Sequence, residues 1–559
     1  MIASVLCAAL VAIGGAAQSE VRSMAPSDVE RQMGAPFYSG AILPTPRQVD
    51  YSEGALPLID GPGGQWRCGL QLPDDEGLCE LMLRLLHRRV DPYLEQFPTV
   101  PGSPSAGEGP VLRFALGSEL AASDLAEQIG RAAELGDLKP QGYILSITAQ
   151  GGLCIGADRT GLLNGLASVL QLLRVEGETL AVACAQVVDW PTFRTRYTAE
   201  YHLPGEEFFD FMMLQKINGF GACYPGMRWS GLTEGHRKGL QGIGEYIRRY
   251  GTMHFMVQFH VGGRGGERPL DCGDPADVET LLTTIRQTLE LTPTQHVMIC
   301  YDDVVPKLQP EEERQFDRPA QAHGALMEQV YRAVKALSPE TVVSFCSPYY
   351  QGRRHRRWRE ENPLLAETLQ YMEDLKAWEN RDIRLVWTGP VTESKVIVPE
   401  DITHYLGLVG EDRKLTYWDN TWHYHQPLRN FHSQYPEGFV DSCADETSYI
   451  NVNGVRPIGR FFSVTANDYY WNPERFDTLH SRQHAVAQFM GPEAVPVAEE
   501  FYKLRGDNYF VFFTRDVNMA ALKEVLDRLK ATSLTPELPD QCLAVYEGMV
   551  KEREKAAQQ

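Results

Sequence analysis

HVMICYDD, residues 296–303, is an apolar run of strand-forming type that leads directly into two acids, Asp302 and Asp303. Six further apolar runs follow Arg194, with amphipathic helical segments between them. They are FGACY at 220–224, MHFMVQF at 253–259, TVVSFCS at 341–347, IRLVWTG at 383–389, KLTYWDN at 414–420 and FVDSC at 439–443. Strands that alternate with helices form parallel sheets, and this many repeats favour closure, so the pattern predicts an α/β fold with a (β/α)8 TIM barrel.

The segments on either side of the predicted barrel differ in pattern. Residues 21–190 are expected to form an α+β accessory domain. Within it, 143–157 is predicted to be a hairpin turned on Gly151 and Gly152, followed by a helix capped by Thr160. The catalytic barrel is expected at 191–490, and a small helical domain at 491–559, where apolar residues recur at helical spacing.

Residues 1–20 form an apolar stretch that ends in small residues, which predicts a signal peptide and a secreted or periplasmic protein. No later run is long and apolar enough to predict a membrane span. The eleven cysteines lack the spacing of a zinc site, although Cys68 and Cys79 are a candidate local disulfide. We therefore predict neither a cofactor nor a metal.

Charge bears on the class of partner. The chain of 559 residues has 74 acidic and 53 basic side chains and a net charge of −21. Such a surface repels phosphate backbones, which argues against nucleic acid as a partner. The basic run at 353–360 is short, and we interpret it as a solvated helix start.

The predicted barrel supplies polar and aromatic side chains where its strands end. These include Cys346, Tyr349 and Tyr350, then Trp387 and Thr388, then Trp418, Asp419 and Asn420. Active sites of (β/α)8 barrels lie at the carboxyl ends of the strands. Aromatic faces beside amides and carboxylates suit a sugar, so we expect a glycan-binding site around Asp302 and Asp303.

Several ordered motifs carry a resemblance to a known family. They are PTPRQV at 44–49, GADRTGLLNGLASVLQLL at 156–173, VVDWPTF at 187–193, YDDVVP at 301–306, VWTGP at 386–390, TYWDN at 416–420 and VTANDYYWNP at 464–473. Together they resemble glycoside hydrolase family 84, whose members release β-linked N-acetylglucosamine. The resemblance implies a retaining β-N-acetylhexosaminidase that acts on a glycan or glycoconjugate bearing an N-acetylhexosamine.

The resemblance also implies a mechanism, in which the substrate acetamido oxygen is the nucleophile and forms an oxazoline. Asp302 would accept the acetamido N–H and orient that group. Asp303 would protonate the leaving oxygen and later deprotonate water. Adjacent carboxylates suit this division, because close like charges favour one ionised and one protonated group.

Further residues match the family's substrate-binding positions. By the resemblance, the Tyr350 hydroxyl faces the acetamido oxygen, while Cys346, Thr388 and Trp418 line the pocket for the acetyl methyl group. Asn420 and Asn451 match amides near the sugar. For Cys346 and Trp418, ordinary packing inside the barrel is an equally good interpretation.

The sequence departs from the family where sugar hydroxyls are bound. His425 stands where the family has an Asp, and Gly226 stands where it has a Lys, with Arg228 nearby. Residues 200–202, Glu-Tyr-His, replace a glycine-rich loop. We therefore expect a changed preference among acetamido sugars or longer glycans, unless Arg228 or His202 restores the contacts.

Two hypotheses remain after this comparison. The first is an active hydrolase with an altered sugar-binding shell, and the second is a glycan-binding protein that has lost most turnover. Retention of both Asp302 and Asp303 favours the hydrolase. His254 and His260 share a strand face six residues apart but have no evident third ligand for a metal. Linkage and aglycone stay open.

Overall fold

The structure is a computed structural model. It describes residues 42–60, 65–96, 109–119, 139–200, 203, 205–223, 227–263, 267–392, 394, 397–413, 415–420, 443–450, 457–505, 518–532 and 537–558. The expected signal peptide lies outside these residues, as do His202, Gly226, His425 and Asn451. None of the described helices has both the length and the apolar character needed to cross a membrane.

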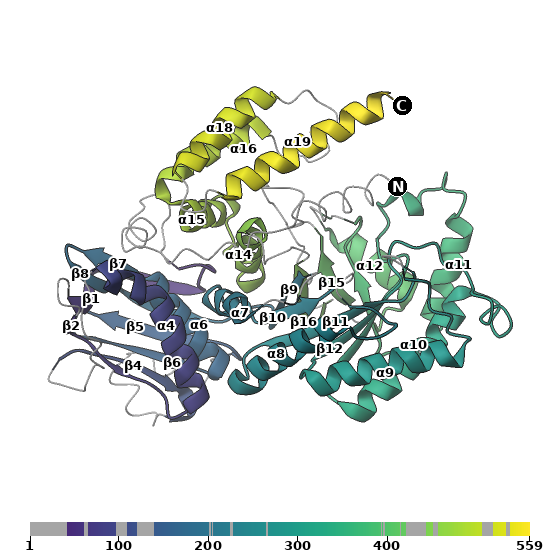
Figure 1. Ribbon diagram of the computed structural model, residues 1–559, viewed down its shortest axis with the longest axis horizontal. Helices are drawn as coiled ribbons and strands as arrows, with labels where there is room; N and C mark the ends of the chain where they lie inside the picture. The colour runs from purple at the N-terminus through teal and green to yellow at the C-terminus, as the bar shows by residue number, and fades with distance from the viewer. Residues whose placement is uncertain are drawn as a thin grey trace.

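An eight-stranded sheet forms the N-terminal part of the molecule, with helices α4 and α6 packed on it (Figure 1). Its strands run in the order β2-β1-β8-β5-β6-β4-β3, and β7 pairs with β8. The strands are β1 (Gln48–Asp60), β2 (Gln65–Trp66), β3 (Gly69–Gln71), β4 (Val111–Leu116), β5 (Tyr143–Thr148), β6 (Gly151–Gly156), β7 (Leu173–Glu176) and β8 (Thr179–Asp189), and the helices are α4 (Glu76–Gln96) and α6 (Arg159–Gln171).

Helix α6 begins two residues earlier than predicted. Its N-cap is Asp158, whose side chain accepts a hydrogen bond from the backbone N–H of Gly161, so the prediction of a Thr160 cap is wrong. A Cβ on Gly161 would lie 2.1 Å from the Gly142 carbonyl oxygen, and one on Gly165 would lie 2.2 Å from Sγ of Cys154. The glycines of this motif therefore let α6 lie directly on the sheet.

The hairpin at 143–157 is confirmed, but the prediction that it turns on Gly151 and Gly152 is wrong, because the turn lies two residues earlier. Thr148 pairs with Gly151, so Gly151 already belongs to the second strand and the turn consists of residues 149–150. Cys68 and Cys79 are both free cysteines, so the candidate disulfide between them is wrong. Sγ of Cys79 instead donates a hydrogen bond to the carbonyl oxygen of Pro73.

A ring of eight parallel strands follows, in the closed order β9-β10-β11-β12-β13-β14-β15-β16 with β16 paired to β9. The strands are β9 (Thr195–Glu200), β10 (Gly219–Ala222), β11 (His254–His260), β12 (His296–Cys300), β13 (Val342–Cys346), β14 (Arg384–Trp387), β15 (Leu415–Asp419) and β16 (Cys443–Ile450). The mixed α/β class with a parallel sheet and a separate accessory sheet is thus confirmed. The connection at 421–442 is outside the described residues, so eight complete βα repeats remain a prediction.

Helices cover the outside of the ring and continue into a C-terminal helical group, drawn green to yellow in Figure 1. Those that follow strands of the ring are α7 (Glu206–Leu214), α8 (Glu234–Tyr250), α9 (Pro275–Leu291), α10 (Pro319–Leu337), α11 (Leu365–Lys376), α12 (Pro399–Val409) and α14 (Pro457–Trp471). Those of the C-terminal group are α15 (Thr478–Met490), α16 (Val495–Arg505), α18 (Met519–Thr532) and α19 (Glu537–Gln558). The domain boundaries themselves stay a prediction.

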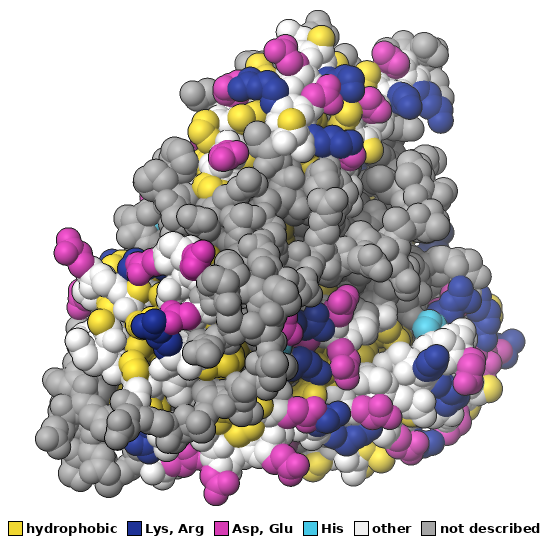
Figure 2. All heavy atoms as spheres, turned by 60° about the vertical axis from the view of Figure 1, so that its left-hand side comes forward, with side chains coloured by type: hydrophobic (Ala, Val, Ile, Leu, Met, Phe, Trp, Pro, Cys, Tyr) yellow, Lys and Arg dark blue, Asp and Glu magenta, His cyan; other side chains and the backbone are white. Residues whose placement is uncertain are grey.

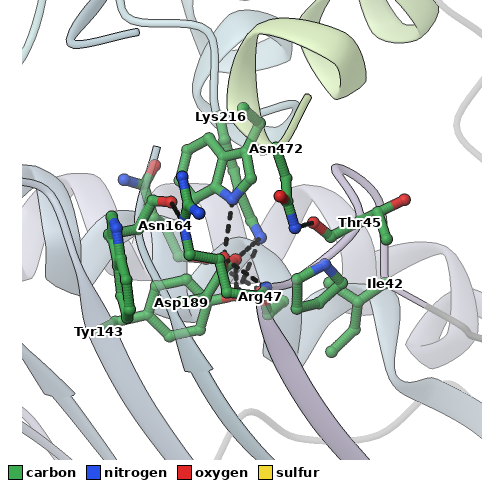
Figure 3. Close-up of polar contacts among 12 residues, drawn as sticks. Ile42, Thr45, Arg47, Tyr143, Asn164, Asp189, Lys216 and Asn472 are labelled. Carbon is green, nitrogen blue, oxygen red and sulfur yellow. Dashed lines mark hydrogen bonds and ion pairs between the residues drawn. The ribbon is translucent and has the colours of Figure 1, made fainter. Parts of the chain in front are cut away.

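A buried polar cluster joins the accessory sheet, the ring and α14 (Figure 3). Asp189, at the end of β8, accepts hydrogen bonds from Tyr143 Oη at 3.0 Å, from Trp471 Nε1 at 2.9 Å and from the backbone N–H of Arg47 at 3.1 Å. Lys216 Nζ lies 3.6 Å from Asp189 Oδ2 and donates to Tyr143 Oη at 2.9 Å. Burial lowers the pKa of Lys216 to about 8, while the Asp189 carboxylate opposes that shift.

Candidate active site

Asp302 and Asp303 lie just beyond the carboxyl end of β12, which places them at the rim of the ring. Asp303 has a φ of 58°, in the left-handed region that residues other than glycine seldom adopt. Its side chain is exposed, whereas the Asp302 side chain is 19% exposed. Strained backbone at a strand end that carries two acids is typical of a functional site.

Tyr350 anchors the second acid. Its hydroxyl group donates a 2.8 Å hydrogen bond to Oδ1 of Asp303, across from the next strand of the ring. Tyr350 is only 5% exposed. Burial, together with the negative charges of Asp303 and Asp302, raises the pKa of Tyr350 well above its ordinary value, so the phenol stays protonated and remains a donor.

His260 anchors the first acid, and the sequence did not identify this role. It is the last residue of β11 and is 1% exposed. Its Nε2 lies 2.9 Å from the carbonyl oxygen of Asp302 and 3.6 Å from Oδ1 of the same residue. A carbonyl oxygen can only accept, so this contact places a proton on Nε2 and points an N–H toward Asp302.

The other histidine of the same strand is far from this site. His254 begins β11, and burial lowers its pKa to about 4. At about 3.3 Å per residue, six residues separate the two rings by roughly 20 Å, so they cannot share a metal ion. The pattern that could have singled out His260 is its place at a strand end, the same signal that singled out Asp302.

The interior of the ring holds a compact group of side chains beneath the two acids. Its members are Tyr197, Cys223, Met256, Met298, Cys300, Cys346, Tyr350, Val386 and Trp418. Cys346 is 6% exposed and Trp418 is 9% exposed, so both pack inside the ring. Burial, and then the hydrogen bond with Cys300, raises the pKa of the Cys346 thiol.

Thr388, Trp418 and Asn420 lie at the ends of β14 and β15. Oγ1 of Thr388 donates to the carbonyl oxygen of Val391 at 3.1 Å, which holds the loop after β14. Nε1 of Trp418 donates to Oδ1 of Asn420 at 2.9 Å, and Nδ2 of Asn420 donates to the carbonyl oxygen of Thr392 at 3.1 Å. The indole and the amide therefore fix each other's orientation.

The basic run at 353–360 supports the loop that follows Tyr350. The run was expected to be a solvated helix start, and in the structure it contains a short 3-10 helix, η3 (Arg356–Trp358), while α11 begins only at Leu365. Arg353 and Arg354 both pair with the buried Asp401. Nε1 of Trp358 donates to the carbonyl oxygen of Gln351 at 2.9 Å. These contacts hold the chain directly after Tyr350 against the ring.

The altered hydroxyl-binding positions are only partly described. His425, Asn451, Gly226 and His202 lie outside the described residues. Arg228 is exposed, and its backbone forms an isolated parallel bridge with His260, so it stands beside the site. On the face shown in Figure 2, the described Lys and Arg side chains are interspersed with Asp and Glu.

One set of described residues has metal-ligand chemistry. Sγ of Cys300, Sγ of Cys346 and a carboxylate oxygen of Asp302 lie within 4.8 Å of one another. Gln258 donates from Nε2 to Sγ of Cys300 at 2.9 Å. The sequence did not predict this grouping, because the two cysteines are 46 residues apart and meet only through the pairing of β12 with β13.

Two family descriptions match parts of the chain. "Beta-N-acetylglucosaminidase" matches residues 267–503, which include both acids and Tyr350. "Glycosyl hydrolase family 20, domain 2" matches residues 96–190, in the accessory part. No curated protein sequence matches the chain significantly.

Solved structures show that the fold is shared. CpGH84B is similar with a TM-score of 0.61 at 14% identity, over 91% of this chain and 89% of that one. The chitobiase of Flavobacterium johnsoniae is similar with a TM-score of 0.56 at 12% identity, over 92% of each chain. The exo β-N-acetylglucosaminidase of Vibrio harveyi gives 0.53 at 11% identity, over 83% and 78%. The two family matches show a glycoside hydrolase of the β-N-acetylhexosaminidase type, and the solved structures show that it shares their fold.

Proposed function

We propose that the chain is a retaining β-N-acetylglucosaminidase of the family 84 kind, which uses the substrate's own acetamido group as the nucleophile. The observation that carries the proposal is the different anchoring of two adjacent carboxylates. Tyr350 donates to Asp303, and His260 contacts Asp302. Two acids in different surroundings are suited to two different roles.

Asp302 orients and polarises the acetamido group in this proposal. His260 donates to the backbone carbonyl oxygen of Asp302 and lies 3.6 Å from its Oδ1, and this contact together with partial burial favours an oriented carboxylate that accepts the substrate N–H. That contact strengthens as positive charge develops on the acetamido nitrogen during ring closure to the oxazoline. Because the acetamido oxygen is the nucleophile, no carboxylate of the enzyme attacks the sugar, unlike in the common two-carboxylate hydrolases.

Asp303 is the general acid and then the general base. Its exposed side chain at the rim can reach a leaving group and, later, a water molecule. The O–H of Tyr350 donates to Asp303. In this proposal it turns to the acetamido oxygen when substrate binds. Tyr350 thus links the two halves of the mechanism.

The pocket for the acetyl methyl group is formed by Cys346, Thr388 and Trp418. Cys346 and Trp418 belong to the interior group beneath the acids, and Thr388 is 2% exposed. These three side chains are buried, and the indole and the thiol offer largely apolar surface, which suits a methyl group. We assign Asn420, held by Trp418, to the sugar as well, and His425 and Asn451 from the sequence alone.

The experiment that tests the proposal compares three nitrophenyl glycosides with the intact enzyme. One carries a 2-acetamido group, one a 2-trifluoroacetamido group and one a plain 2-hydroxyl group. We expect the trifluoroacetamido substrate to react much more slowly, because fluorine withdraws electron density from the attacking oxygen, and the plain glucoside to be inert. A thiazoline analogue of the oxazoline should inhibit. Comparable turnover of the plain glucoside would rule out substrate assistance.

A further inference from the structure

Cys300 and Cys346 face each other on neighbouring strands of the ring. Cys300 ends β12 and Cys346 ends β13, and the two are direct partners in the parallel pairing. Both side chains point to the interior of the ring, and their thiols are hydrogen-bonded to each other. A thiol pair therefore lies one layer below the rim that bears Asp302 and Asp303.

Asp302 completes a three-ligand set with these thiols. It lies two residues beyond Cys300, just past the end of β12. One ligand atom from each of the three residues lies within 4.8 Å of the other two. The thiols are buried and Asp302 is partly exposed, so a ligand would enter from the side of Asp302, at the rim of the ring.

The ligand chemistry selects the class of ion. Two thiolates favour soft or borderline cations, and a carboxylate is a common third ligand of Zn²⁺. In a tetrahedral site with Zn–S bonds of about 2.3 Å the sulfurs lie roughly 3.8 Å apart, so each side chain has to move by less than about 1 Å from its present place. A hard cation such as Mg²⁺ or Ca²⁺ would not be held by sulfur.

Neighbouring groups support the same set. Gln258 directs an amide N–H at Sγ of Cys300 from 2.9 Å, which is the type of hydrogen bond that surrounds metal-bound thiolates. His260 holds the backbone of Asp302. Asp303 adds a further negative charge nearby. These groups already surround the three ligands in the structure.

We propose that Cys300, Cys346 and Asp302 bind a soft divalent cation, Zn²⁺ or Cd²⁺, and that the bound ion inhibits the enzyme. Each coordinated thiol gives up its proton to solvent, and the fourth position of the ion faces the pocket. The ion occupies the place of the acetyl methyl group. It also takes Asp302 as a ligand, so that Asp302 cannot accept the acetamido N–H. The inhibition rests on the proposed role of Asp302, but the binding of the ion does not.

Binding is tested with Cd²⁺ alone, on the full chain and without substrate. The readouts are the ultraviolet thiolate-to-Cd²⁺ absorption, equilibrium dialysis, and protection of Cys300 and Cys346 from alkylation, followed by mass spectrometry. The test variant is Cys300→Ser, which keeps an acceptor for Gln258 but is a poor ligand, with Cys300→Ala as a second variant. The control is Cys79→Ser, because Cys79 is the one half-buried thiol among the free cysteines of the described part.

We expect the wild type and Cys79→Ser to bind one Cd²⁺ with thiolate absorption. Both Cys300 variants should bind at least about 100-fold more weakly. Absence of protection at Cys300 and Cys346 in the wild type, or unchanged thiolate absorption in folded Cys300 variants, would overturn the site.

Activity separates the two proposals. Zn²⁺ should inhibit the wild type competitively, whereas Cys300→Ser should keep its basal activity and resist inhibition, because Cys300 itself does not touch the sugar. Ion binding without inhibition would leave the metal site standing and contradict the role given to Asp302. Inhibition that persists in Cys300→Ser would contradict the metal site instead.

Discussion

The hydroxyl group of Tyr350 lies 2.8 Å from Oδ1 of Asp303 and donates a hydrogen bond to it. The two residues follow neighbouring strands, β13 and β12, whose residues Cys346 and Cys300 are paired. The hydrogen bond therefore depends on the pairing of these two strands. It orients the Asp303 side chain, which is exposed at the rim.

Replacement of Tyr350 by Phe removes this hydrogen bond and leaves the packing of the ring in place. A hydrogen bond to a charged group is worth about 1.5 to 3 kcal/mol, so kcat/KM should fall by roughly 10- to 150-fold. The loss should lie mainly in kcat, because the contact orients a reacting group. The measurement is steady-state kinetics with thermal unfolding as the control for folding. An unchanged kcat would show that Tyr350 has no part in the reaction.

Asp302 and Asp303 should respond differently to the leaving group. Asp303→Ala should slow substrates with poor leaving groups far more than activated phenolates, since the latter scarcely need protonation. Asp302→Ala should slow both kinds, because the acetamido group is no longer oriented. The test is a plot of log kcat/KM against leaving-group pKa for the wild type and both variants. Equal slopes for the two variants would contradict the division of roles.

His260 should act as a positioning residue through Asp302. We expect His260→Gln to lower kcat by about 10-fold, because the loss of one hydrogen bond costs about 1.4 kcal/mol, with no change in the dependence on the leaving group. His254→Gln is the matched control, since His254 begins the same strand at the opposite end of the ring. Its kcat/KM should stay within about two-fold of the wild type. Equal losses in both variants would point to a general effect on β11.

Asp189 should be essential for stability because its removal leaves the buried Lys216 without its carboxylate. Asp189→Ala should lower the free energy of unfolding by about 3 to 5 kcal/mol, measured by urea denaturation. The control is Arg314→Gln, which removes an exposed pair with Glu311 and should change that free energy by less than about 1 kcal/mol. If the two variants lost the same stability, the buried cluster would not join the parts of the molecule as inferred.

Buried histidines should make the protein sensitive to acid. Burial lowers the pKa of His296, His323 and His484 to about 3 each, while an unfolded histidine titrates near 6.5. Between these values the unfolded state binds protons that the folded state excludes, so the free energy of unfolding falls as the pH falls below about 6.5. One pH unit below that point the loss is about 1.4 kcal/mol per histidine.

The measurement is the free energy of unfolding at pH 7.0 and pH 5.5 in the wild type and in His296→Gln. Ring nitrogen Nε2 of His296 lies 2.6 Å from Oγ of Ser344, and a Gln amide at that position carries no titrating proton. The variant should lose less stability than the wild type over this interval. An identical pH dependence in both proteins would show that His296 has the same protonation state in the folded and the unfolded protein.

The sequence by itself determined six of the eight strands of the ring, β10 to β15, and which residues stand at their ends. It did not predict β9, and the run predicted at 439–443 shares only Cys443 with β16. Apolar runs such as HVMICYDD can be recognised as strands because a buried parallel strand needs an unbroken apolar stretch. The two acids at its end mark where the chain leaves the core. Asp302, Asp303 and Tyr350 could therefore be placed at one rim from order alone. The same local reasoning failed at the cap of α6, where Asp158 and Thr160 are both acceptable caps and only the close approach of the helix to the sheet decides between them.

Only the tertiary structure decided which of these residues meet. His260 reaches Asp302, and Cys300 reaches Cys346, because the register of β11, β12 and β13 brings their last residues to one level. Asp189 and Lys216 likewise meet inside the junction of sheet, ring and α14. A strand's own pattern specifies its faces and its ends. Its register against a neighbour is set by the packing of the whole ring, and no short stretch of sequence contains that information.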